Sequence, residues 1–356
     1  VDRGVAVRPG RPDLCRDQRN PAQHHCRTAA GPATREDVTM EFALNEQQRD
    51  FAASIDAALG AADLPGVVRA WAAGDVAPGR KVWQQLANLG VTALGVAEKF
   101  DGLGASPVDL VVALERLGRW CVPGPVTESI AVAPILLAHD DQAERSHGLA
   151  SGELIATVAM PPRVPRAVDA DTAGLVLLAG DGSVTEGTPG DCHRSVDPSR
   201  RLYEVAASGQ AWRAPKDVVA RAYEFGALAT AAQLVGAGQA LLEAAVNYAK
   251  QRTQFGRAIG SYQAIKHKLA DVHIAIELAC PLVYGAAVSL EPRDVSAAKA
   301  AASEAALLAA RSALQTHGAI GFTCEHDLSL WLLRVQALHS AWGTPQEHRR
   351  RVLEAL

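Results

Sequence analysis

The chain has 356 residues, of which 48% are hydrophobic, enough for two or three packed units that each have their own core. The formal net charge of −4 leaves no excess of basic side chains to follow a phosphate backbone, which disfavours general nucleic-acid binding. The six cysteines show no pairing rhythm, as in proteins of a reducing compartment, so we expect a cytoplasmic location. No unbroken apolar run approaches the roughly 20 residues of a membrane-spanning helix, and no signal peptide opens the chain, so we expect neither membrane insertion nor secretion.

Residues 1–39 are rich in Arg, Pro and His and have no apolar periodicity, so we expect a disordered tail or a mis-assigned start before Met40. This segment contains four side chains of the metal-binding types, at a spacing that fits no usual zinc module: Cys15, His24, His25 and Cys26. We therefore predict no metal site.

Residues 40–145 have the pattern of an N-terminal helical domain. Asn45, with Gln48 three residues later, predicts a capping box at the first helix. Ser106 followed by Pro107 predicts a second helix start, because serine caps a helix and proline suits its first turn.

Residues 146–215 change to short runs typical of strands, which predicts a middle β domain. The runs are residues 154–159, 175–179 and 202–206, separated by Gly and Pro clusters. The segment 180–182, Gly-Asp-Gly, predicts a hairpin turn.

Residues 216–356 return to helical periodicity and predict a bundle of long helices with short connections. We expect one helix to begin at Ser296 as its N-cap and to end before Gly318. An earlier helix has a stripe of mostly small residues that permits close helix approach: Leu228, Ala231, Val235, Gly238, Leu242 and Ala245.

Two blocks in this last region are distinctive. Residues 250–257 read Lys-Gln-Arg-Thr-Gln-Phe-Gly-Arg and are followed by Ser-Tyr-Gln-Ala-Ile at 261–265; residues 315–323 read Gln-Thr-His-Gly-Ala-Ile-Gly-Phe-Thr. In this order they resemble the signature of the acyl-CoA dehydrogenase family. Residues 94–104 and 196–202 are similar to family patterns as well, so the resemblance spans residues 40–356. It implies a mainly α fold with a small β domain: an N-terminal helical domain, a middle β domain and a C-terminal four-helix bundle.

The resemblance implies FAD as the cofactor. An arginine can meet the FAD pyrophosphate with a planar array of donors, and glycines let backbone amides approach the dinucleotide closely. In the family, the arginine and the glutamine-glycine segment reach FAD across a subunit interface, so an oligomer is implied. The positions that match the family's FAD contacts are Arg252, Phe255, Gln263, Gln315, Gly318, Ala319 and Thr344.

The catalytic base of the family has no counterpart here. Acyl-CoA dehydrogenation needs a carboxylate to remove the α proton, while the β hydride goes to the flavin. The commonest base position is occupied by Trp342, and the minority position corresponds to about Gly226. Glu224, two residues away, is a weak alternative; we expect both Glu224 and Glu347 to be solvated helix residues. Residues 156–167 also lack the family's flavin-contacting stretch in the β domain.

These absences resemble one subunit of the heteromeric acyl-CoA dehydrogenases that act on steroid-side-chain thioesters, where a sister subunit supplies the carboxylate. The implied partners are an acyl-CoA substrate, the sister subunit and an electron-transfer flavoprotein. The alternative is a catalytically silent structural or regulatory partner of an active acyl-CoA dehydrogenase. A DNA-associated member of the fold is disfavoured, because the charge balance is acidic and no basic domain is added.

Overall fold

The computed structural model describes residues 43–138, 140–180, 182–323 and 325–356. The predictions for residues 1–39, including the four metal-ligand types, and for a start at Met40 lie outside these described residues.

The first part of the described chain is helical, as predicted. Asn45 and Gln48 form the expected capping box, in which each side chain accepts a hydrogen bond from the other's backbone N–H. Ser106 forms a second one with Asp109. The helices are α1 (Glu46–Gly60), α2 (Leu64–Ala72), α3 (Ala77–Asn88), η1 (Glu98–Phe100), α4 (Pro107–Arg119), the π-helical η2 (Thr127–Val132), α5 (Ala133–Leu136), η3 (Asp140–Gln142) and α6 (Ala143–Ser151).

The middle part forms a small sheet in the order β1-β3-β4-β5-β2, with β6 paired to β4. Strands β1 and β3 are parallel, and the other pairs are antiparallel. Gly180 pairs with Ser183, so β3 and β4 form the predicted hairpin, although Asp181 is outside the described residues. The strands are β1 (Ala156–Ala159), β2 (Ala167–Val168), β3 (Leu175–Gly180), β4 (Ser183–His193), β5 (Leu202–Ala207) and β6 (Trp212–Arg213).

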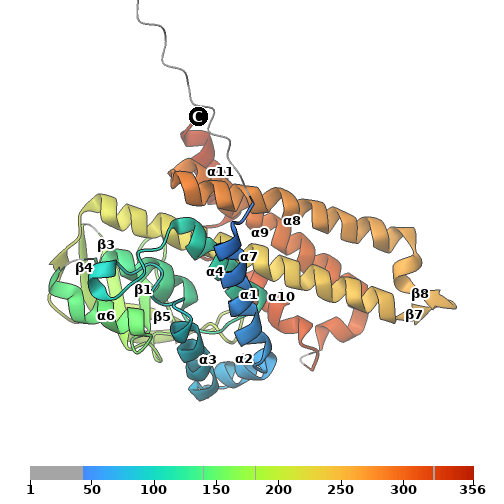
Figure 1. Cartoon of the computed structure of the whole chain (residues 1–356), viewed down its shortest axis with the longest axis horizontal. Helices are drawn as coiled ribbons and strands as arrows, with labels where there is room; N and C mark the ends of the chain where they lie inside the picture. The colour runs from blue at the N-terminus through green and yellow to red at the C-terminus, as the bar shows by residue number, and fades with distance from the viewer. Residues whose placement is uncertain (1–42, 139, 181, 324) are drawn as a thin grey trace, which may run out of the picture. The chain divides into compact units, whose positions relative to one another are not determined.

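The last part is a bundle of long helices (Figure 1). The prediction that Ser296 caps a helix is wrong: the N-cap is Glu291, because Pro292 starts the helix one turn earlier, and Ser296 lies buried inside it. Gly318 does end this helix, with φ +68°. The elements are α7 (Lys216–Gln251), β7 (Thr253–Gln254), β8 (Arg257–Ala258), η4 (Ile259–Ser261), α8 (Gln263–Ser289), α9 (Pro292–His317), η5 (Gly318–Phe322), α10 (Leu328–Ser340) and α11 (Pro345–Glu354).

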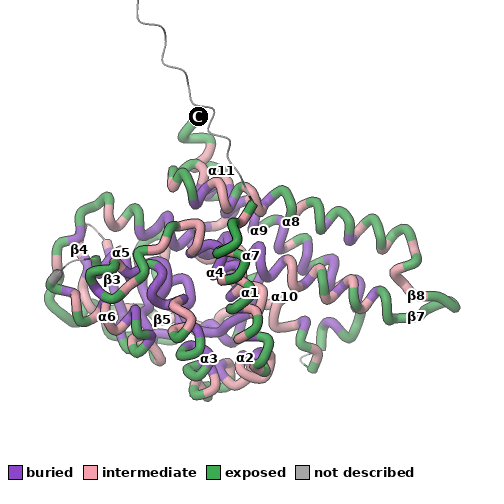
Figure 2. Tube along the Cα trace, in the orientation of Figure 1, coloured by how far each residue is buried: buried purple, intermediate pink, exposed green. Residues whose placement is uncertain are grey.

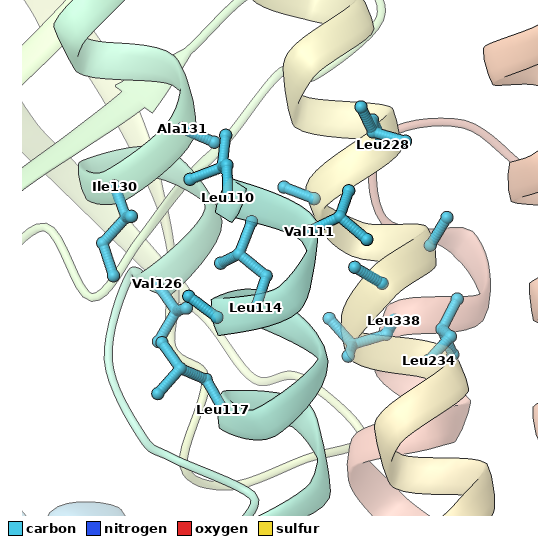
Figure 3. Close-up of a cluster of buried hydrophobic side chains, with 14 of the residues drawn as sticks. Leu110, Val111, Leu114, Leu117, Val126, Ile130, Ala131, Leu228, Leu234 and Leu338 are labelled. Atoms are coloured by element: carbon cyan, nitrogen blue, oxygen red, sulfur yellow. The ribbon is translucent and has the colours of Figure 1, made fainter. Parts of the chain in front are cut away.

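Helix α7 is the central element, and α4, α8, α9 and α10 all pack on it. Residues 222–238 of α7 are buried on every side, which is more than the single stripe that the sequence predicted. The crossing with α4 depends on glycine, since a Cβ on Gly236 would lie 1.9 Å from the Glu115 carbonyl oxygen. Figure 3 shows Val111 of α4 beside α7, with Val126 of the following segment on the opposite side of α4.

Two helices of the described chain, α7 and α8, are long and apolar enough to cross a membrane by length and composition. The sequence expectation concerned unbroken apolar runs, whereas these two helices meet a criterion of mean hydropathy, because small residues keep the hydropathy high across interruptions in the apolar runs. The apolar window of α7 is 83% buried inside the protein, whereas that of α8 is 33% buried. Figure 2 shows exposed residues along the outer length of α8, so much of its apolar surface is uncovered in the single chain.

Candidate functional site

A groove at one end of the bundle gathers the residues that carry the family signature. It has a volume of about 440 Å³ and lies where α7 ends, α8 begins and α9 ends, next to the β7–β8 hairpin (Figure 1). We call it the C-terminal groove. Its lining is Tyr248, Arg252, Gln254, Phe255, Ile259, Tyr262, Ile265, Gln315, Thr316, His317 and Gly318.

The β7–β8 hairpin presents an aromatic ring to the outside. Phe255 and Gly256 form its two-residue turn, with φ +50° and +80°, the backbone combination that suits such a short hairpin. The Phe255 side chain is consequently 92% exposed. Arg252, directly before β7, is also exposed, so an aromatic ring and a guanidinium both line the groove without being buried by this chain.

The opposite wall of the groove is the end of α9. His317 stacks on Tyr248 with ring centroids 4.3 Å apart and donates its Nδ1–H to the Ala313 carbonyl oxygen at 2.8 Å. Burial lowers the pKa of His317, so the ring is neutral near pH 7. Beyond it Gly318 has open space where a side chain would stand, which leaves the backbone accessible to a ligand.

The groove brings together four of the seven predicted contacts: Arg252, Phe255, Gln315 and Gly318. The side chains of Gln263 and Ala319 are exposed nearby but do not line it. Thr344 lies elsewhere, as the N-cap of α11, where its hydroxyl accepts a hydrogen bond from the Glu347 N–H at 3.2 Å.

Sequence reasoning missed the aromatic side of this groove. Tyr248 precedes Arg252 by four residues on α7, so helical spacing could have placed both on one face. Tyr262 lies under the guanidinium of Arg257, 4.0 Å from ring centroid to Cζ. The sequence alone could not place His317 in this groove, because His317 reaches Tyr248 only when α9 packs in the folded protein.

Trp342, at the position that the resemblance assigns to the base, is 2% exposed. Its indole Nε1–H donates to Glu128 Oε1 at 3.0 Å. Its carbonyl oxygen accepts from the Tyr223 hydroxyl at 3.2 Å and from His348 Nε2 at 2.8 Å. Burial lowers the pKa of His348 to about 4, so this imidazole is a neutral donor near pH 7.

A buried lysine forms hydrogen bonds with the loop that carries Trp342. Lys299 Nζ donates to the carbonyl oxygens of Leu338, His339 and Gly343 at 3.1–3.3 Å. A further contact of 3.1 Å joins it to Ser303 Oγ. The loop between α10 and α11 is therefore held by several hydrogen bonds to the body of the bundle.

Glu224, the weak alternative for the base, is not a free carboxylate either. Glu224 is 7% exposed and forms an ion pair with Arg351, so the prediction that it is solvated is wrong. Its helix packs inside the bundle, where burial raises its pKa. Glu347 is exposed, as predicted, and completes the capping box of α11.

The family-like segment 196–202 acquires a structural role. Asp197 accepts a hydrogen bond from Arg334 Nε at 2.6 Å, and Ser199 Oγ accepts one from Arg334 Nη2 at 2.9 Å. Arg334 belongs to α10 and also donates to the Val122 carbonyl oxygen at 2.8 Å. This buried cluster joins the sheet region to α10 of the bundle.

Comparison with known proteins agrees with this architecture. The acyl-CoA dehydrogenase N-terminal domain matches residues 45–153, and the acyl-CoA dehydrogenase C-terminal domain matches residues 217–356. Acyl-CoA dehydrogenase IpdE2 from Mycobacterium tuberculosis (strain ATCC 25618 / H37Rv) is 33% identical over 292 residues, which cover 81% of this chain and 90% of that protein. Acyl-CoA dehydrogenase FadE27 from the same organism is 24% identical over 88% of this chain and 98% of its own length.

Solved structures share the fold at low identity. The ChsE4-ChsE5 complex from Mycobacterium tuberculosis has a TM-score of 0.77 at 21% identity, covering 88% of this chain and 98% of the matched chain. Butyryl-CoA dehydrogenase from Megasphaera elsdenii has a TM-score of 0.76 at 20% identity, covering 89% and 99%. The predicted fold class is confirmed. Because the two domains and the relatives together span most of the sequence, the chain belongs to the acyl-CoA dehydrogenase family.

Proposed function

We propose that this chain is a subunit of an FAD-dependent acyl-CoA dehydrogenase that catalyses α,β-dehydrogenation of an acyl-CoA thioester, with the catalytic base supplied by a sister subunit. The observation that carries the proposal is Trp342 at the usual base position. An indole has only an N–H donor and cannot accept the α proton, and this N–H is already bonded to Glu128.

The other position that carries a base in the family is closed as well. Gly226 has no side chain, and a Cβ there would lie 2.2 Å from Cε3 of Trp342. Glu224, on the same helix, is held by Arg351. Neither position at which the family carries its base thus holds a free carboxylate in this chain, which supports a base supplied by another subunit.

The C-terminal groove fits the adenosine and pyrophosphate half of FAD. The exposed Arg252 guanidinium would hold the pyrophosphate, the Phe255 ring would pack on the adenosine, and Gly318 would let the backbone approach. When bound, the flavin supplies the hydride acceptor of the reaction. The contribution of this chain is to bind and orient the cofactor, because no base in this chain occupies the family position.

An uncovered apolar face on α8 supports assembly with another subunit. Ile274, Leu278 and Leu282 recur every four residues and are 55%, 66% and 46% exposed. Such a stripe on a 27-residue helix is a surface suited to packing against a partner helix. Phe255 in the C-terminal groove is 92% exposed, which also supports contact with another subunit, since a partner would cover the ring.

Fold relatives support a proposal for the substrate class and for the electron acceptor. Fold relatives include a protein described as the Tcur3481-Tcur3483 steroid ACAD, with a TM-score of 0.77, and the ChsE4-ChsE5 complex. The Acidaminococcus fermentans electron transferring flavoprotein study contains a further fold relative, with a TM-score of 0.77. We propose a steroid-side-chain thioester as substrate and an electron-transfer flavoprotein as acceptor.

The test is co-expression of this chain with a sister acyl-CoA dehydrogenase subunit, followed by size-exclusion chromatography with flavin absorbance and a dehydrogenation assay on each peak. We expect a yellow, active mixed tetramer and an inactive single chain. A yellow, active oligomer of this chain alone would overturn the proposal.

A substitution in the groove separates shared FAD binding from a catalytically silent structural role. Arg252→Ala in the mixed complex should lower the flavin content, while Lys250→Ala, an exposed neighbour outside the groove, should not. If the complex with Arg252→Ala assembles and retains its full flavin content, the chain is a structural partner instead.

A further inference from the structure

Lys299 is a buried cation to which the proposed reaction gives no role. It is 0% exposed on α9, a helix that packs against both α10 and α11. The four hydrogen bonds of its Nζ go to three backbone carbonyl oxygens and to Ser303 Oγ. The Ser303 hydroxyl gives its own proton to the Lys299 carbonyl oxygen at 2.7 Å, so it is also an acceptor for Nζ. Four acceptors suit an ammonium, which has three donors, better than an amine.

Two of the carbonyl oxygens belong to the end of α10. Leu338 and His339 lie in the last turn of this helix, where the carbonyl groups have no partner within the helix. A positive charge is favourable at this end, because the helix dipole places partial negative charge there. Lys299 therefore caps α10 from a neighbouring helix, and the same ammonium also reaches Gly343 in the following loop.

The charge of Lys299 is balanced by these neutral oxygens. Glu347, the carboxylate whose negative charge reaches Lys299, accepts instead from the Thr344 N–H at 2.7 Å and from the Thr344 hydroxyl at 2.9 Å. Without the ammonium, three carbonyl dipoles would point at one another and lack a donor, which is unfavourable in a buried place. The backbone of the loop would then have to move.

The loop needs this support because of the backbone of Trp342. Its φ is +56°, in the left-handed region that a bulky residue adopts only under constraint, and Gly343 follows with φ +100°. Trp342 lines a cavity of about 440 Å³ between the sheet region and α10, whereas Lys299 is not part of the lining. The backbone conformation that Lys299 supports therefore decides where this wall of the cavity lies.

We propose that Lys299 is a positioning residue, whose ammonium holds the backbone of residues 338–343 so that Trp342 forms a fixed wall of the adjoining cavity. Lys299 touches neither substrate nor cofactor and acts through Trp342. The role in catalysis rests on the proposed function, under which this cavity receives the acyl-CoA, because Trp342 occupies the base position. The role in holding the loop does not depend on that function.

Hydrogen–deuterium exchange with mass spectrometry tests the loop in the full-length Lys299→Met variant. The measurement is made at about pH 6, below the pKa of about 7 of the buried lysine, so that the unmodified side chain is charged. We expect residues 338–348 to exchange about tenfold faster, as the loss of one hydrogen bond from a charged donor allows. Residues 222–238 of α7 should keep their rate. Unchanged exchange in residues 338–348, or equal acceleration in both segments, would overturn the proposal.

Lys299→Gln serves where Lys299→Met does not fold. Its amide keeps N–H donors but lacks the charge, and its oxygen would face the carbonyl groups, so the same acceleration is expected. The matched controls are Lys266→Met, at an exposed lysine of α8, and Ser312→Ala, at a serine 5% exposed further along α9. Both should leave the exchange of residues 338–348 unchanged. Equal acceleration in Ser312→Ala would mean that any buried change in α9 loosens the loop, and the proposal would fail.

Kinetics of the mixed complex test the consequence for the substrate. Lys299→Met should raise KM for the acyl-CoA by about tenfold, with a smaller change in kcat, because the wall of the cavity is no longer held in place. The flavin content should stay unchanged, since Lys299 lies outside the C-terminal groove. A loosened loop with unchanged KM would overturn the positioning role. If the unmodified complex is inactive, the proposed function fails, while the exchange measurement still decides whether Lys299 holds the loop.

Discussion

The indole of Trp342 lies directly on Gly226, so close that a Cβ on this glycine would be 2.2 Å from Cε3 of the ring. By the resemblance that the sequence showed, these are the two positions where members of the family place their catalytic base. The two losses are therefore sterically coupled: the large ring at one position fits only because the other has no side chain. A carboxylate placed at position 226 while Trp342 is kept would therefore overlap the indole ring.

Gly226→Ala tests this coupling. The new methyl group would overlap the indole, and the overpacking should lower the free energy of unfolding by about 1–3 kcal/mol. Denaturant unfolding followed by circular dichroism measures this change. The matched control is Gly238→Ala on the same helix, where the added Cβ would make ordinary contacts of 3.5 Å. There we expect unchanged or increased stability, since alanine favours a helix over glycine; equal losses in both variants would contradict the tight packing on Trp342.

The buried pair of Asp197 and Arg334 makes a second prediction. Asp197→Asn removes the counter-charge of an arginine that is 2% exposed, and breaking such a pair should lower the free energy of unfolding by about 3–5 kcal/mol. Asp101→Asn is the control, because the ion pair of Asp101 with His147 is exposed, and its loss should change stability by less than about 1 kcal/mol. Similar values for both substitutions would show that the buried pair adds nothing to stability.

Lys299 gives the protein a pH dependence above neutrality. Burial lowers the pKa of Lys299 to about 7, although the negative charge of Glu347 opposes this shift. Between about pH 7 and 10.4 the unfolded chain then binds more protons than the folded protein, so stability rises with pH across this window. Between pH 7.5 and 9.5, the free energy of unfolding should rise by about 2 kcal/mol through this lysine.

The Lys299→Met variant isolates this contribution, because it lacks the titrating group. Its free energy of unfolding should rise less over the same pH interval than that of the unmodified chain, measured by urea unfolding at both pH values. Lys266→Met, at an exposed lysine of α8, should keep the full rise. Identical pH slopes for Lys299→Met and the unmodified chain would mean that the acceptors keep the buried ammonium charged throughout.

The order of helices, sheet and helices could be predicted because its signals are local. Asn45 and Ser106 cap helices through residues only three positions away, and the strand runs are bounded by Gly and Pro. The predicted start of α9 was wrong because serine is also a common N-cap residue. The helix instead begins at Pro292, with Glu291 as its N-cap, since proline suits the first turn of a helix.

The candidate site was predictable only as far as its motifs are contiguous. Arg252 and Phe255 belong to one block of the sequence, so the sequence alone could assign both to the same site. The contacts of Trp342 with Glu128 and Gly226 join positions more than 100 residues apart, which no periodicity connects. The ion pair that buries Glu224 has the same origin, since Arg351 follows it by 127 residues.

The last prediction concerns Phe255, whose ring is 92% exposed. In the single chain the ring buries almost nothing, so Phe255→Ser should leave the free energy of unfolding within about 0.5 kcal/mol of the unmodified value. In the mixed complex the same change should lower the flavin content, because the ring would lose its packing on the adenosine. The flavin-to-protein absorbance ratio after gel filtration measures this. Leu353→Ser, at a leucine 71% exposed on α11 outside the groove, should leave the ratio unchanged. If Phe255→Ser leaves it unchanged too, the ring serves some contact other than the cofactor, and the groove binds FAD through Arg252 and Gly318 alone.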